Sequence, residues 1–106
     1  KDYPPPVRKC ISYIKENLEK KLTLAGLSKV CSLSPDYLSA LFKKTTGQNI
    51  SRFILRQKLE LSKSLLKGKY DYSEISCYLS FCSESYFIYC FKTRVRCDSA
   101  RNMLRH

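Results

Sequence analysis

Two segments that repeat along the chain constrain its fold more than any other feature of the sequence. Residues 34–43 (SPDYLSALFK) are matched by residues 83–92 (SESYFIYCFK), and a short apolar stretch precedes each copy. Serine is a preferred N-cap, so each copy predicts the start of a helix that follows a shorter helix through a tight turn. Each half of the chain is therefore expected to form a helix-turn-helix unit, since two copies are too few for a solenoid.

The spacing of apolar residues predicts about seven helices and no strand. Val7, Ile11 and Ile14 recur at helical spacing, and Thr23 is placed to cap a short helix. Residues 51–67 predict the longest helix, which joins the two units. We expect an all-α fold with two homeodomain-like subdomains on this central helix. The expected divisions are residues 1–6 as the remnant of a linker, 7–49 as the first helix-turn-helix subdomain, 50–69 as the joining helix and 70–106 as the second subdomain.

Capping signals mark the helices of the second half. Asp71 with Glu74 has the pattern of a capping box, and Ser83 is placed to cap the second helix of the unit. Asp98 is placed to cap a last helix with Ala100, Met103 and Leu104 inside. The residues expected in the core lie on the inward stripes of these helices and include Leu38, Leu41, Phe42, Leu55, Leu59, Leu66, Ile75, Leu79, Phe87, Cys90 and Phe91.

Charge narrows the class of partner. The chain of 106 residues carries 20 Lys and Arg against nine Asp and Glu, a net charge of +11. This excess favours a polyanionic partner over the near-neutral surface of an ordinary enzyme. Hydrophobic residues make up 43%, which argues against wholesale disorder, and no apolar stretch approaches the roughly 18 residues needed to span a membrane.

The six cysteines contain no C-x-x-C pair, and the only histidine is the last residue, His106. A zinc site usually has close ligand pairs that include histidine. Most of the cysteines fall where the helical pattern places an apolar residue. We therefore expect free thiols that act as small hydrophobic side chains in a reducing cytoplasm. The alternatives are a disulfide framework or a metal site; we expect neither a metal nor another cofactor.

The second helix of a helix-turn-helix unit lies in the major groove of DNA, where residues near its N-terminus contact base edges. The expected second helices are residues 34–46 and 83–95. The outward positions are the predicted base-reading residues: Asp36, Ser39, Ala40 and Lys43 in the first helix, and Glu84, Ser85, Ile88 and Tyr89 in the second. This set lacks Arg, Asn and Gln, so we expect modest direct readout, supported by thymine methyl groups and DNA shape.

Contacts to DNA phosphates have more candidates. Ser34 and Ser83 are expected at helix N-termini, where free N–H groups and the helix dipole favour an anion. The predicted phosphate-binding residues are Ser34, Lys44, Arg52, Arg56, Lys58, Ser83, Lys92 and Arg94. Each Lys or Arg that neutralises a phosphate releases counterions, so the affinity should fall steeply with salt.

Other interpretations remain open, because a lysine-rich helical surface is often only solvated. The chain could be a helical module whose main partner is a protein, with only nonspecific affinity for DNA. Ile88 and Tyr89 would then form a dimer patch or a contact with a missing domain. An enzyme has no support in the sequence: it has no recognisable carboxylate pair, phosphate-binding loop or metal motif.

The repeated segments resemble a known family, the AraC/XylS-type transcription regulators. Residues 33–47 (LSPDYLSALFKKTTG) resemble its first recognition helix and the following glycine almost position for position. Residues 13–18 (YIKENL) are similar to its opening helix, and the two leucines at 65–66 end the joining helix as in the family. Residues 85–87 (SYF) with 91–92 (FK) are similar to its second recognition helix.

The resemblance covers residues 7–105 and identifies residues 7–106 as a domain of this type. It implies a seven-helix domain whose two units bind adjacent major-groove segments of promoter DNA in a bacterial cytoplasm. It also implies a separate sensing or dimerisation domain, usually N-terminal, and activation through RNA polymerase. Because the sequence does not begin with Met, we expect it to be a fragment of a longer protein.

The sequence departs from the family pattern at several positions. Lys58 stands where arginine is usual, and residues 96–99 (RCDS) replace a Gly-x-Ser/Thr-Pro motif. Since the second unit is less close to the pattern, we expect the first unit to dominate sequence-specific binding. Serine replaces small residues elsewhere: Ser28, Ser62 and Ser76 stand where alanine is favoured, and Ser32 and Ser80 where glycine is favoured in the turns. At such turns a serine would be strained by a positive φ angle.

Overall fold

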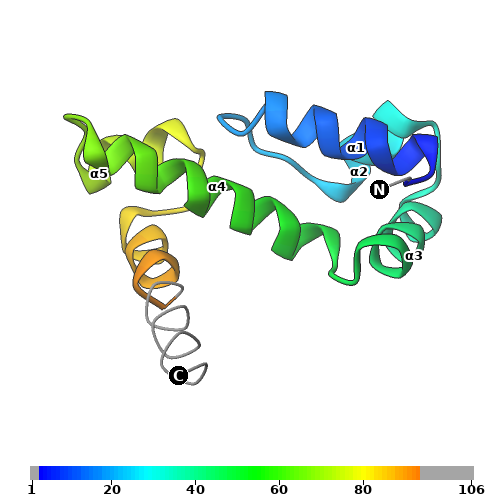
Figure 1. Cartoon of the computed structure of the whole chain (residues 1–106). Coiled ribbons are helices and arrows are strands. Elements are labelled where there is room, and N and C mark those ends of the chain that lie inside the picture. The colour runs from blue at the N-terminus through cyan, green and yellow to red at the C-terminus, as the bar shows by residue number, and fades with distance from the viewer. Residues whose placement is uncertain (1–2, 94–106) are drawn as a thin grey trace, which may run out of the picture.

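The computed structural model describes residues 3–93, which form helices joined by short turns and contain no strand (Figure 1). Five helices have both ends described: α1 (Pro5–Glu16), α2 (Leu24–Cys31), α3 (Pro35–Thr46), α4 (Ile50–Lys67) and α5 (Tyr72–Tyr78). A sixth helical segment runs from residue 84 to residue 93. The predicted all-α class is confirmed. The expected last helix, from Asp98 onward, lies outside the described residues.

The joining helix α4 carries a unit at each end (Figure 1). Helices α1, α2 and α3 pack around the first core, to which α4 contributes Ile50 and Phe53. Helix α5 and the segment 84–93 pack around a second core, to which α4 contributes Leu59. Seven residues expected in the core are buried: Leu38, Phe42, Leu59, Ile75, Leu79, Phe87 and Cys90. Four others, Leu41, Leu55, Leu66 and Phe91, are half-buried. Within the described residues, no helix is both long and apolar enough to cross a bilayer.

The first helix begins earlier than the sequence predicted. Pro5 and Pro6 occupy its first turn, with Pro4 as the N-cap. The first N–H groups of a helix have no partner within the helix, so proline loses no hydrogen bond there. Pro5 and Pro6, which the sequence placed at the end of a linker, therefore belong to the first helix. Tyr3 also packs against the first core.

The caps that start the two second helices are present as predicted. Ser34 Oγ accepts a hydrogen bond from the N–H of Tyr37 at 3.2 Å, and Ser83 Oγ accepts one from the N–H of Tyr86 at 3.1 Å. Thr23 caps α2 in the same manner. These local bonds satisfy N–H groups that the helix itself leaves free.

The second half starts with the predicted capping box. Asp71 accepts from the N–H of Glu74 at 2.8 Å, and the Glu74 side chain accepts from the N–H of Asp71 at 3.0 Å. Helix α4 begins one residue before the predicted start, with Asn49 as its cap. These caps depend on residues three apart and are therefore readable from the sequence.

The two tight turns place serine in the left-handed backbone region. Ser32 and Ser80 both have a φ angle of 58°. This confirms the strain expected where serine replaces glycine, because a side chain beyond Cα is unfavourable at positive φ. Gly47, which ends α3, has a φ angle of 84° and carries no such cost.

Three buried helix serines replace alanine without leaving an unsatisfied hydroxyl group. Ser28 donates to Ala25 O at 2.7 Å, and Ser62 donates to Leu59 O at 2.6 Å. Ser76 makes the same bond three residues back in its own helix. Such a bond within one helix satisfies the hydroxyl but makes no new link between elements.

The five cysteines in the described part of the chain are free thiols, as predicted. Cys10, Cys31 and Cys90 are buried and serve as core residues, whereas Cys77 and Cys82 are exposed. Burial, and then the adjacent Cys31 thiol, raise the pKa of Cys10 to about 12. Cys10 therefore stays protonated and inert at neutral pH.

We expect Phe42→Ala to lower the free energy of unfolding by about 3–5 kcal/mol through the cavity it leaves. Phe42 is fully buried, and its ring meets that of Phe53 edge to face at 5.3 Å between centroids. Denaturant unfolding followed by circular dichroism measures this loss. Leu41→Ala, on the same helix at a half-buried position, should cost less. An unchanged unfolding midpoint for Phe42→Ala would contradict this packing.

We expect Ser62→Ala to leave the free energy of unfolding unchanged or raise it by about 0.5 kcal/mol, because alanine is the better helix former. The Ser62 side chain is fully buried and bonds only within α4. The same denaturant experiment measures the effect. A decrease in the free energy of unfolding above about 1 kcal/mol would show that the hydroxyl group also stabilises the fold beyond its own hydrogen bond within α4.

Candidate nucleic-acid interface

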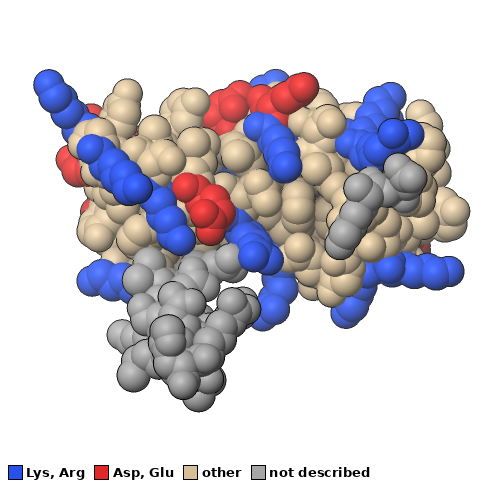
Figure 2. Space-filling model, viewed as in Figure 1, with Lys and Arg blue, Asp and Glu red and all other residues tan. Residues whose placement is uncertain are grey.

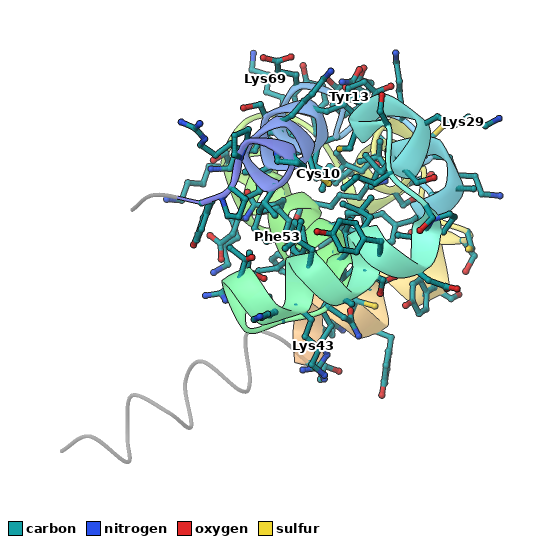
Figure 3. The ribbon with its side chains drawn as sticks, turned by 90° about the vertical axis from the view of Figure 1, so that its right-hand side faces the viewer. Cys10, Tyr13, Lys29, Lys43, Phe53 and Lys69 are labelled. Carbon is teal, nitrogen blue, oxygen red and sulfur yellow. The ribbon has the colours of Figure 1, made fainter. Side chains whose placement is uncertain are left out.

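The second helices of the two units, α3 and the segment 84–93, project toward the same side of the molecule. Figure 1 shows both on the lower side, with α1 on the upper side. Figure 3, turned by 90°, shows Lys43 of α3 on that lower side, pointing away from the bundle, while Phe53 of α4 points into it. A partner that approaches from below therefore meets both helices.

The first of these helices presents three of its four predicted base-reading residues to solvent. Asp36, Ala40 and Lys43 are exposed, and Ser39 is half-buried. The opposite side of α3 is held by the buried Leu38 and Phe42. The core therefore fixes which side of α3 faces outward.

The second helix presents Glu84, Ser85 and Tyr89, and the Tyr89 side chain is 68% exposed. Ile88 differs from the prediction of an outward residue, because it is half-buried and packs against the second core. Phe87, on the inner side, contacts the rings of its aromatic neighbours, at 4.9 Å between centroids in the nearest case. The packed rings set the orientation of this helix.

Most predicted phosphate-binding residues are exposed. Arg94 lies outside the described residues. The exposed members of the set are Ser34, Lys44, Arg52, Arg56, Ser83 and Lys92. Figure 2 shows Lys and Arg side chains over much of this face, along its lower edge and also at its upper left and upper right, while Asp and Glu gather mainly in its middle and upper parts. The side that carries the two second helices thus includes positively charged side chains, although positive charge is not confined to it.

Lys58 is a correction to the predicted set. Its side chain is buried, and its ammonium group donates to Lys20 O at 3.1 Å and to Leu79 O. The ring of Phe81 lies 5.8 Å from the same nitrogen. Burial lowers the pKa of Lys58, and the charge of Glu19 opposes this shift. An ammonium group committed to two carbonyl groups inside the protein does not reach a phosphate.

Two tyrosines outside the predicted site, Tyr37 and Tyr86, are exposed at the start of the second helices. Tyr37 is 56% exposed and Tyr86 is 47% exposed, three residues after their capping serines. A hydrogen bond with Cys90 is the main cause that raises the pKa of the Tyr86 phenol. Phenols can donate to phosphate groups. Their equivalent places in the repeat were the only signal for them in the sequence.

The comparisons with known proteins agree with this geometry. A family model described as a helix-turn-helix domain matches residues 27–105. The probable transcriptional regulator LumQ of Photobacterium leiognathi is 33% identical over 82 residues, which cover 76% of this chain and 33% of that protein. The chain spans about a third or less of the first three curated relatives that it matches, with shares of 33%, 16% and 29%.

Two solved structures share the fold. The C-terminal domain of AraT, a response regulator from Geobacillus stearothermophilus, has a TM-score of 0.83 and 25% sequence identity, covering 88% of this chain and 78% of that chain. The DNA-binding domain of AdpA, solved in complex with a target DNA, has a TM-score of 0.79 and 18% identity, covering 85% of this chain and 82% of that chain. At the latter identity the likeness shows the fold alone.

Two capped helix-turn-helix units on one shared helix define this chain as a DNA-binding domain of the helix-turn-helix class. The family match covers most of the chain and confirms the resemblance seen in its repeated segments. The chain belongs to the AraC-type helix-turn-helix family of transcription regulators.

Proposed function

We propose that this domain binds specific promoter sequences in double-stranded DNA, with α3 and the second unit's helix in adjacent segments of the major groove. The observation that carries the proposal is the placement of two capped helices, each with an exposed polar first turn, on the same side of the molecule, whose lower edge carries Lys and Arg side chains (Figures 1 and 2). Helix N-termini directed at DNA can contact both base edges and phosphates. The AdpA complex with target DNA supports this use of the fold.

The first unit supplies most of the base reading in this proposal. Asp36, Ala40 and Lys43 are exposed at outward positions of α3, whereas in the second unit Ile88 turns partly into the core. Asp36 can accept from cytosine N4, and Ala40 can pack on a thymine methyl group. The second unit then adds phosphate contacts and a smaller share of the sequence preference.

Phosphate contacts position both helices. Ser34 Oγ and Ser83 Oγ each accept a backbone N–H, which leaves the hydroxyl hydrogen free to donate to a phosphate oxygen. Lys44, Arg52 and Lys92 supply exposed positive charge. These contacts carry no sequence information and fix the register of the domain on the duplex.

The wider role extends this proposal to the longer protein. Membership of this family implies a separate sensing or dimerisation domain, a cytoplasmic location and activation of transcription through RNA polymerase. The curated relatives support a longer protein, since the match covers only a third of LumQ. The competing proposal is a protein-interaction module with mainly nonspecific DNA affinity, which the exposed Tyr70, Tyr78 and Tyr89 favour.

Selection of binding sites from random duplex DNA at about 150 mM salt tests the proposal, because nonspecific binding is weak there. We expect two enriched elements whose centres lie roughly one helical turn apart. One enriched element would mean that only the first unit reads bases. The absence of any enrichment would contradict sequence-specific binding by this domain and favour the protein-interaction module.

Substitutions in the two second helices test whether the first unit supplies most of the base reading. We expect Asp36→Ala and Ser39→Arg to alter the selected sequence, whereas Glu84→Ala and Tyr89→Ala leave the selected sequence nearly unchanged. A lost base contact should change discrimination by roughly 1 kcal/mol, about fivefold in Kd. Fluorescence anisotropy with selected and scrambled duplexes measures both effects. A larger loss of specificity from the second pair would reverse the ranking.

A further inference from the structure

The two tight turns of the repeat differ in one respect that links the two units. Ser32 and Ser80 are equivalent residues with the same φ angle of 58°. Ser80 Oγ donates to Glu19 O at 2.6 Å, across 61 residues of sequence. Within the described residues, the Ser32 side chain makes no such hydrogen bond. Both turns therefore carry a strained serine, but only the serine of the second turn forms a hydrogen bond to the first unit.

Lys58 makes a second link at the same place. Its ammonium group donates to Lys20 O, in the chain that follows α1, and to Leu79 O, at the end of α5. One side chain of α4 thus holds the main chain of both units. The side chain is only 7% exposed, so both acceptors are needed to compensate a charge removed from water.

The contacts around these bonds are consistent with a fixed junction. Leu18 is half-buried and packs against both cores. Phe81, next to Ser80, lies within 5.8 Å of Lys58 and belongs to the second core. Because the three hydrogen bonds end on backbone carbonyl groups, they hold the course of the chain and not merely a side-chain rotamer. We call Lys58, Ser80, Glu19 and Lys20 the junction.

We propose that the junction fixes the angle between the two units and thereby sets the spacing of the two DNA elements that the domain accepts. This inference rests on the proposed binding by both units. Each added base pair turns the second element by about 34° and moves it about 3.4 Å. A rigid domain can bind the altered spacing only by bending the DNA or by losing the contacts of one unit, which weakens binding. A domain that hinges at the junction can instead reorient its second unit to reach the displaced element.

Lys58 and Ser80 are positioning residues in this proposal, because neither touches DNA. A merely structural role would lower stability or weaken binding equally at every spacing. A positioning role changes the ratio of affinities between spacings. The ratio is therefore the informative quantity, and the affinity at the selected spacing serves as an internal reference.

The test compares Ser80→Gly with its matched control, Ser32→Gly. Both variants remove the same backbone strain at equivalent turns, but only Ser80→Gly loses the bond between the units. Lys58→Met removes the second link, and Lys58→Arg is the conservative variant that should retain it. Circular dichroism melting confirms folding; if Lys58→Met does not fold, the serine pair still decides the question.

Kd values are measured by fluorescence anisotropy on duplexes that carry the two selected elements at the selected spacing and at one or two base pairs more or less. We expect wild type, Ser32→Gly and Lys58→Arg to lose about tenfold or more at two base pairs. In Ser80→Gly this loss of affinity should be about fivefold smaller, which corresponds to the net free energy of one hydrogen bond. In Lys58→Met the loss should be reduced at least as much.

Two negative outcomes are distinguishable. In the first, selection gives two elements, but Kd depends on spacing in the same way for Ser80→Gly and Ser32→Gly. That result would contradict the positioning role of the junction and leave the proposed function intact. A single selected element would mean that the second unit reads no bases, which contradicts base reading by both units and overturns the spacing role with it.

Discussion

The fold depends on one shared apolar surface, the inward stripe of α4. A helix-turn-helix unit of about 40 residues buries too little surface to be stable alone, and each unit here completes its core with residues of α4. Phe53 meets Phe42 in the first core, while Leu59 lies in the second core with Phe87. The outward side of each second helix is therefore set by how its unit packs onto the same helix.

The polar residues of α4 follow from this sharing. Ser62 is buried within a helix that serves the second core, and its hydroxyl group finds a carbonyl group in its own helix. Lys58 lies where the two units meet, and its charge cannot be satisfied inside α4. It takes acceptors from both units, at Lys20 and Leu79. The same burial that stabilises the domain thus creates the place where the units are tied together.

Much of the fold was predictable because its signals are local. The caps at Ser34 and Ser83 depend on a backbone group three residues away, and core residues such as Phe42 follow helical spacing. The candidate site was less predictable. Tyr37 was ambiguous, since tyrosine serves equally in cores and on exposed surfaces. Lys58 was assigned to phosphate because lysine is usually exposed, and its acceptors lie 38 and 21 residues away in sequence.

By itself the sequence determined where the helices capped by Thr23, Ser34, Asp71 and Ser83 start, which stripe of each faces inward, and that two equivalent units share one helix. These properties depend on residues within a few positions of one another. Only the tertiary structure decided that Lys58 faces the interior, that Ile88 turns partly into the core, and that Ser80 differs from Ser32. Those outcomes depend on backbone carbonyl groups and packing surfaces that folding brings together from distant parts of the chain.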